Sequence, residues 1–339
     1  MKVFRYKKGI VLLLIGLFLL ALVLAGCSGK PQSPSTGQGA KEEKPTVKFP
    51  EKPLTLIVAY GAGGGTDITA RLLAAHLEKE LGQPVNVINV TGGGGWNGWS
   101  QLAHSKPDGY TIGYINVPNI FPGYLDPKVK RPENLESFAV IMNHVTDPCI
   151  WAVKGDSKYK SLQELLDDAK KNPEKISFAA HGVGGDDHLA LLQVEKVTGA
   201  KFKVVHNDST SISITQVLGG HVQVLGANVS EVFNQHKKGE LRVLGVMAEK
   251  RSEFLPDVPT FKEQGLNVIM SVSRGIAAPA GTPKEILDIL TSALDKATKN
   301  PEHIAKAKEL GLALDPIKGE DYKKFLKAEE QRIKELMGW

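Results

Sequence analysis

The chain is poor in the residues that mark disulfide-rich or nucleic-acid-binding proteins. Its 339 residues include two cysteines, Cys27 and Cys149, too few for a disulfide framework. Aromatic residues make up 6%, so platforms for stacking bases are sparse. Four cations lie within the first eight residues, and without them the formal net charge falls from +5 to +1: Lys2, Arg5, Lys7 and Lys8. No basic patch remains, and nucleic acid is not an expected partner.

The sequence also lacks the short motifs of common enzyme classes. GAGGGTD, residues 61–67, is not followed by the Gly-Lys-Ser/Thr of a phosphate-binding loop. GGGGWNG, residues 92–98, contains a G-x-G-x-x-G pattern, but the next expected strand ends in Asn-Val, without the acidic residue that binds a ribose. No G-x-S-x-G or H-E-x-x-H motif occurs. We therefore expect no catalysis, no cofactor and no metal.

The N-terminus has the pattern of an export signal. A basic start is followed by an uncharged apolar run, residues 10–26, and by Leu-Ala-Gly-Cys at residues 24–27. This junction resembles a bacterial lipoprotein signal, which implies that residues 1–26 are removed and Cys27 is lipidated. The run is slightly short for a membrane span, which is the alternative. Residues 27–52 are rich in Pro, Gly and Ser and predict a flexible tether.

From Pro53 onward, short β-like runs alternate with helical patterns, which favours an α/β fold with parallel sheets. Two such sheets are plausible at this length. Strands are expected at residues 54–60, 85–90, 110–117, 138–145, 149–154, 175–180, 201–207, 222–228 and 241–247. Helices are expected at residues 67–82, 96–106, 161–172, 186–199, 211–220, 230–239, 282–300 and 320–337.

Two glycine-rich loops, residues 61–67 and 92–98, follow the first two expected strands. Ligands of open α/β sheets bind beyond the carboxyl ends of the strands. Glycines let the main chain approach a ligand and turn its N–H groups inward, and a helix N-terminus adds partial positive charge. The loops therefore predict a cradle for a small anion such as a carboxylate. Thr66 is expected to cap the following helix, and Asp67 to complement its dipole.

The ordered motifs LTLIVAYGAGGGTDITARLLAAHLEKELG, KPDGYTIG, HGVGGDDHLALLQVEKVTG, LPDVPTFKEQGLNV and GIAAPAGTPKEIL are similar to those of the extracytoplasmic solute receptors of tripartite tricarboxylate transporters, also called Bug proteins. The resemblance covers Pro53 to Trp339. It implies a two-lobed periplasmic-binding-protein fold of type II, each lobe a mainly parallel sheet flanked by helices. Lobe 1 would comprise residues 53–147 and 275–339, and lobe 2 residues 148–274.

The resemblance also implies a function. Members bind a small organic carboxylate, such as a di- or tricarboxylate or related acid, and deliver it to membrane permease subunits. The ligand-binding residues so implied are Tyr60, Gly61, Gly64, Gly65, Thr66, Asp67, Gly94, Gly95, Asn97, Asn116, His181, Gly184, Asn207, Asn228 and Arg274. A monomer is expected. A ligand sensor coupled to a signalling partner, or an extracytoplasmic enzyme using the same cleft, are the alternatives.

Several positions depart from the family pattern. Asn228 stands where Asp is usual, and Ser273-Arg274 replaces an aromatic pair. Both changes suggest a cleft more receptive to anions, with Arg274 able to hold a carboxylate in two hydrogen bonds. His181 and His188 flank two aspartates, but without a third histidine we expect a capped helix rather than zinc. Cys149, in an apolar strand, is expected to be buried and inert.

Overall fold

The computed structural model describes residues 47–339. The predicted leader, Cys27 and most of the tether lie outside the described residues. The strands are β1 (Leu54–Val58), β2 (Val85–Asn89), β3 (Thr111–Val117), β4 (Phe138–Lys154), β5 (Ser177–His181), β6 (Lys203–Asn207), β7 (Val224–Asn228), β8 (Leu241–Val246) and β9 (Ser271–Pro279). Two short 3₁₀ helices span Gly93–Gly95 and Leu135–Ser137.

The α-helices follow the strands in alternation over most of the chain. They are α1 (Gly65–Leu81), α2 (Trp96–Ala103), α3 (Pro122–Leu125), α4 (Leu162–Lys171), α5 (Asp186–Thr198), α6 (Thr210–Leu218), α7 (Val229–Lys237), α8 (Lys284–Lys299), α9 (Pro301–Glu309) and α10 (Gly319–Met337). Among residues 47–339, no helix is both long enough and apolar enough to cross a membrane.

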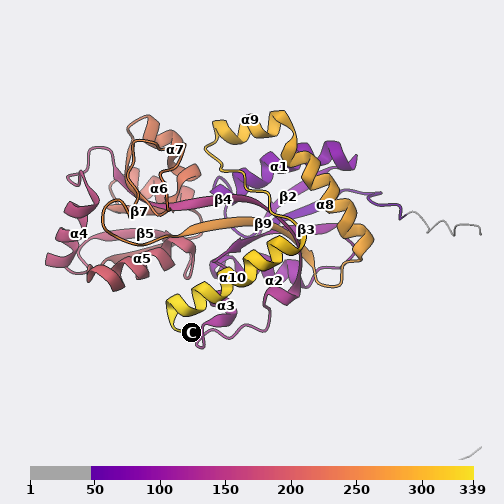
Figure 1. Ribbon diagram of the computed structural model, residues 1–339, viewed down its shortest axis with the longest axis horizontal. Helices are drawn as coiled ribbons and strands as arrows, with labels where there is room; N and C mark the ends of the chain where they lie inside the picture. Colours follow the sequence, from indigo (N-terminus) through magenta and orange to yellow (C-terminus); the bar gives the residue numbers. More distant parts are fainter. Residues whose placement is uncertain (1–46) are drawn as a thin grey trace, which may run out of the picture. The chain divides into compact units, whose positions relative to one another are not determined.

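The sheet has two parts that share one long strand. In the first part, β1 pairs in parallel with β2 and β3, and β9 runs antiparallel between β3 and residues 138–148 of β4. In the second part, the end of β4 pairs antiparallel with β7 and β8, while β5 pairs in parallel with β6 and β7. Figure 1 shows β4 and β9 running side by side between the helices α4–α7 and the helices α1, α2 and α8. The α/β prediction is confirmed, with antiparallel strands at the centre.

The predicted elements differ from the structure mainly at β4 and β9, the two strands that connect the parts of the sheet, and at two helices. Residues 138–145 and 149–154 were expected as separate strands, but β4 runs through Asp147 and Pro148 without a break. Strand β9 was not predicted, because it is buried along nearly its whole length and shows no alternation of apolar and polar residues. Helices α3 and α9 were also missed, and each begins at a proline.

Buried apolar clusters stabilise both parts of the sheet, and the one around Trp151 also includes Ile57 and Trp99 of the first part. Trp151 on β4 packs edge-on against Phe178, Phe202 and Phe261 in the second part, with ring centroids 5.1–5.5 Å apart. In the first part, Leu73 and Leu77 of α1 pack with Leu290 of α8 in one buried cluster. Parallel strands covered on both faces by such helices leave their carboxyl ends as the place where loops can bind a ligand.

A chain of buried polar side chains fixes α9 to the first part of the sheet. Tyr114 on β3 bonds through its hydroxyl to His144 Nδ1 at 2.8 Å, and His144 Nε2 lies 2.9 Å from His303 Nε2 on α9. Burial lowers the pKa of His303 to about 4, helped by the nearby charge of His76, and it lowers the pKa of His144 well below 6.5. Both imidazoles are therefore neutral in the folded protein at neutral pH.

The buried, neutral pair of His144 and His303 predicts that the folded protein loses stability in mild acid. Because the pKa of His303 is about 4 in the folded protein and the ordinary value for histidine is 6.5, the unfolded chain binds more protons between these values, and stability falls as pH drops through that window. His303→Gln should reduce the slope of unfolding free energy against pH by up to about 1.4 kcal/mol per pH unit. Urea unfolding at pH 7, 6, 5 and 4.5 measures this. The exposed His221→Gln is the control, and equal slopes in both variants would contradict the account.

Candidate functional site

The ends of strands from both parts of the sheet meet at a small polar cavity. We call it the central cavity; its volume is about 10 Å³, room for roughly one water molecule. The loops after β1, β5 and β7 and the start of α6 contribute to it, together with β3 and β9. Its lining residues are Tyr60, Gly64, Gly65, Thr66, Asn116, His181, Asp186, Ser209, Thr210, Asn228, Glu231, Val272 and Arg274.

A carboxylate of the protein itself lies on the predicted anion cradle. Gly65, the first residue of α1, donates its backbone N–H to Glu231 Oε1 at 2.9 Å. Glu231 belongs to α7, and its other oxygen accepts the N–H of Asn228 at 2.9 Å. A Cβ on Gly65 would lie 2.8 Å from Glu231 Oε1 and 2.4 Å from Arg274 Nη2. The close approach of these groups therefore requires glycine, and the site holds a carboxylate at a helix N-terminus.

The start of α1 differs from the expectation in one respect. Thr66 is not the N-cap; Gly64 takes that position with an extended backbone, and no side chain caps the helix. The Thr66 hydroxyl instead accepts a hydrogen bond from Asn116 Nδ2 at 2.8 Å. Asp67 lies in the first turn as expected, where it accepts the N–H of Gly63 at 2.9 Å and pairs with Arg71 at 2.9 Å. The oxygens of Asp67 thus hold the loop itself.

Arg274 is deeply buried and already paired. Its Nη1 lies 2.8 Å from Asp147 Oδ2, and both side chains are 1% exposed. Its Nη2 donates to Asn228 Oδ1 at 3.2 Å and lies 4.0 Å from Glu231. Burial raises the pKa of Asp147, an effect that the Arg274 charge opposes. The positive charge suggested by the sequence is therefore balanced by Asp147, and it does not by itself make the cleft more receptive to anions.

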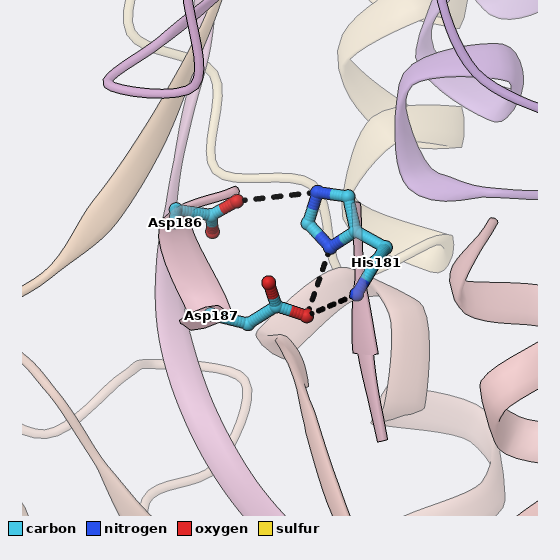
Figure 2. Close-up of side chains that lie close together, drawn as sticks. All are labelled: His181, Asp186 and Asp187. Carbon is cyan, nitrogen blue, oxygen red and sulfur yellow. Dashed lines mark hydrogen bonds and ion pairs between the residues drawn. The ribbon is translucent and has the colours of Figure 1, made fainter. Parts of the chain in front are cut away.

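His181 is held between two carboxylates at the end of β5 (Figure 2). Its Nδ1 lies 2.9 Å from Asp187 Oδ2 and its Nε2 3.4 Å from Asp186 Oδ1, while its backbone N–H also donates to Asp187 at 2.8 Å. Burial lowers the pKa of His181, but the charges of Asp187 and Asp186 outweigh burial and raise it to about 10. The two carboxylates therefore favour a protonated imidazole, and the cluster is a buried ion pair at neutral pH.

Asp186 and its partners separate the central cavity from a larger one. Asn119 Nδ2 lies within 3.1 Å of Tyr60 Oη, His181 Nε2 and Asp186 Oδ1. On the other side, Cys149 Sγ donates to Asp186 Oδ2 at 3.0 Å. Cys149 is a free, buried cysteine, and burial raises the pKa of its thiol well above the usual value. This thiol therefore lacks the exposure and the low pKa that a nucleophile needs.

The larger cavity, which we call the side cavity, has a volume of about 690 Å³. The loops after β2, β5 and β6 border it, with α3, α5 and the end of the chain. Its lining residues are Gly93, Gly94, Trp96, Asn119, Pro122, Gly123, Asp126, Pro127, Lys128, Val129, Arg131, Gly182, Val183, Gly184, His188, Leu189, Leu192, His206, Asn207, Asp208, Met337 and Trp339. It lies next to the central cavity through the contacts of Asn119.

The comparisons with known proteins agree with this architecture. The family model described as "Tripartite tricarboxylate transporter family receptor" matches residues 69–338. This chain belongs to that receptor family. It is 34% identical over 256 residues to the "UPF0065 protein in gbd 5'region" of Cupriavidus necator, covering 76% of this chain and 77% of that protein. It is 30% identical to "Protein BugT" of Bordetella pertussis, covering 74% and 78%.

A solved structure of this receptor family extends the likeness to three dimensions. The "periplasmic binding protein BugD" superposes with a TM-score of 0.81 at 29% identity, covering 86% of this chain and 98% of that chain. The predicted family and its periplasmic-binding-protein fold are confirmed. The predicted lobe boundaries and ligand-binding residues stay predictions.

The structure brings eleven of the predicted ligand-binding residues of this family receptor to the two cavities. Tyr60, Gly64, Gly65, Thr66, Asn116, His181, Asn228 and Arg274 line the central cavity, and Gly94, Gly184 and Asn207 line the side cavity. The other four line neither. Gly61 N–H donates to Asp208 O at 3.3 Å, Asp67 holds its own loop, Gly95 packs on Trp99, and Asn97 Nδ2 donates to Thr91 O at 3.0 Å.

Sequence reasoning missed Asp147, Glu231, Asn119, Ser209 and Thr210. A signal for Glu231 exists in the sequence, because Asn228 and Glu231 have the three-residue spacing of a helix capping box. Asp147 lies in the middle of a strand beside a proline, and Asn119 in a turn after β3. No local pattern distinguishes these two from ordinary polar residues.

The buried pair predicts that Arg274 stabilises the receptor. Arg274→Leu leaves the Asp147 carboxylate buried without its cation, and it should lower the free energy of unfolding by about 3–5 kcal/mol. The double variant with Asp147→Leu should recover most of that loss, since it removes the unpaired charge. Arg251→Leu, which breaks an exposed ion pair with Glu263, is the control and should cost about 1 kcal/mol or less. A single Arg274 variant as stable as this control, by chemical denaturation, contradicts the assignment.

Proposed function

We propose that this receptor is a lipid-anchored extracytoplasmic solute-binding protein that captures a small organic carboxylate between the two parts of its sheet. It delivers the acid to the membrane permease of a tripartite tricarboxylate transporter and catalyses no reaction. Membership of the receptor family supports the transport role. The position of the chain outside the cytoplasm rests on the leader, and the lipid anchor on Cys27; release of a Cys27→Ser variant from membranes tests the anchor.

One observation carries the choice of ligand: the N-terminus of α1 already binds a carboxylate. The Glu231 side chain is 6% exposed and lies on the Gly65 N–H. A solute carboxylate has the same charge and geometry, and it would make the same hydrogen bond if Glu231 moved aside. We therefore propose that the solute displaces Glu231 from Gly65. The hydrogen bond from the Gly65 N–H to Glu231 is then replaced by one to the solute, so no additional contact has to form.

Two buried polar atoms beside the central cavity support a solute at this place. Asn116 Oδ1 and Arg274 Nε have no hydrogen-bond partner in the described part of the chain. The great majority of buried polar atoms make hydrogen bonds, so the lack of a partner for each of these two atoms needs an explanation. A bound acid supplies oxygen for the Arg274 N–H and, through a hydroxyl or a bridging water, a donor for Asn116.

The protonation of His181 and the burial of Cys149 support the proposal that the protein catalyses no reaction. His181 carries its proton between Asp186 and Asp187, and so it cannot act as a base at neutral pH. The Cys149 thiol is buried. These groups fix one another's positions, and we propose that the solute is bound and released unchanged.

Gly65→Val should weaken carboxylate binding strongly. The added Cβ would lie where Glu231 or a solute oxygen must approach, and one or two charge-assisted hydrogen bonds at about 1.5–3 kcal/mol each would be lost, which predicts roughly a ten- to several-hundred-fold weaker Kd. Calorimetric titration with succinate, benzoate and 4-hydroxybenzoate measures this, with thermal melting to check the fold. Ala62→Val, on the exposed side of the same loop, is the control. A folded Gly65→Val variant that binds the acids as tightly as its parent would contradict the proposal that this loop binds the carboxylate.

A further inference from the structure

The side cavity is the ligand-sized volume next to the cradle. Its 690 Å³ falls within the range of about 300–1,000 Å³ typical of small-molecule sites, whereas the central cavity of about 10 Å³ holds one water at most. Only one layer of side chains separates the two. Asn119 lines the side cavity, and its amide nitrogen contacts Tyr60, His181 and Asp186, which line the central cavity. A solute held at Gly65 therefore has the side cavity within reach of the rest of its body.

The walls of the side cavity are suited to a ring. Trp96 contributes an indole, and α5 contributes Leu189 and Leu192. Val129 and Val183 line the same space and are 51% and 69% exposed. Exposed apolar surface of this kind gains stability when another apolar body covers it. A short aliphatic dicarboxylate would leave these side chains uncovered, whereas a ring would bury them.

Two polar features fit an acid that also carries a hydrogen-bond donor. The Asn119 amide nitrogen faces the Asp186 carboxylate, which fixes its orientation, and Asn119 Oδ1 is buried without a partner in the described chain. That oxygen can accept a hydrogen bond from a hydroxyl or an amide. Arg131 lies over the Trp96 ring at 5.1 Å. A hydrogen bond from Ser100, together with the nearby charge of Arg131, lowers the pKa of Glu133. The lining of the side cavity thus presents two cations, Arg131 and Lys128, to an acidic solute, beside two acids of its own, Asp126 and Asp208.

We propose that the solute is a ring-bearing organic acid rather than a short aliphatic dicarboxylate. Its carboxylate lies at Gly65, its ring fills the side cavity against Trp96 and Leu192, and a ring hydroxyl or amide donates to Asn119 Oδ1. This inference rests on the proposed function, because it assigns a class of acid to the same receptor site. Selectivity between acids then comes from the walls of the side cavity, while the cradle binds the carboxylate that all of them share.

The test is calorimetric titration of the full-length receptor with 4-hydroxybenzoate, benzoate and succinate. The two ring acids should bind at least about tenfold more tightly than succinate, a difference within reach of a well-filled apolar pocket. Val183→Asp adds a negative charge and Leu192→Trp adds bulk in the side cavity, and each should weaken binding of 4-hydroxybenzoate by about tenfold or more. Val197→Asp, at another exposed valine 57% accessible and outside the cavity, should bind like the parent.

The outcomes separate this inference from the proposed function. Succinate binding more tightly than both ring acids overturns the inference and leaves the receptor function standing. Ring acids that bind equally well to Val183→Asp, Leu192→Trp and the Val197→Asp control also overturn it, since their site is then elsewhere. If none of the three acids binds the folded parent protein, the choice of a ring-bearing acid is wrong; if a wider set of organic acids fails as well, the proposed function is wrong too.

Discussion

The hydrogen bond between the Gly65 N–H and the Glu231 carboxylate is the contact on which the site depends. It joins the N-terminus of α1, from the first part of the sheet, to α7, from the second. The N-terminus of α7 is itself satisfied by an acid, because Asp147 accepts the Ser230 N–H at 3.3 Å. Helix N-termini that could bind a solute anion therefore bind side-chain carboxylates of the protein instead. Under the proposed function, a solute would compete with these carboxylates, and this competition would limit its affinity.

Four acids and two cations are buried around the central cavity, so the carboxylates outnumber the cations there. Asp147 faces Arg274, and Asp186 and Asp187 face His181, so Glu231 is the acid without a cation of its own within hydrogen-bond distance. Burial raises the pKa of Asp187 to about 6, against the opposing charge of His181. Exchanging Glu231 for a solute carboxylate keeps the total charge beside Arg274 unchanged. Adding a second anion without moving Glu231 would place two like charges at one cation, which is unfavourable.

Much of this architecture could be predicted from sequence, and the exceptions have physical reasons. Periodic apolar residues identified β1, α1, β5 and α5, and the glycine loops identified the edge of the sheet where the cavities lie. Strand β9 was not identified, because a strand buried on both faces shows no alternation. Thr66 was misassigned as a cap, since the extended Gly64 can take that position without a side chain. The partner of Arg274 is 127 residues away in sequence, and long-range pairs of this kind leave no local pattern.

A crystal structure of the receptor with a bound organic acid, chosen from those that bind in titration, tests the central claim most directly. The account predicts that a carboxylate oxygen of the solute lies within hydrogen-bond distance of the Gly65 nitrogen and that Glu231 Oε1 has moved away from its present 2.9 Å contact. It also predicts that Arg274 remains paired with Asp147. A bound acid elsewhere in the protein, with the bond between Gly65 and Glu231 intact, would contradict the claim that Glu231 holds the place of the solute.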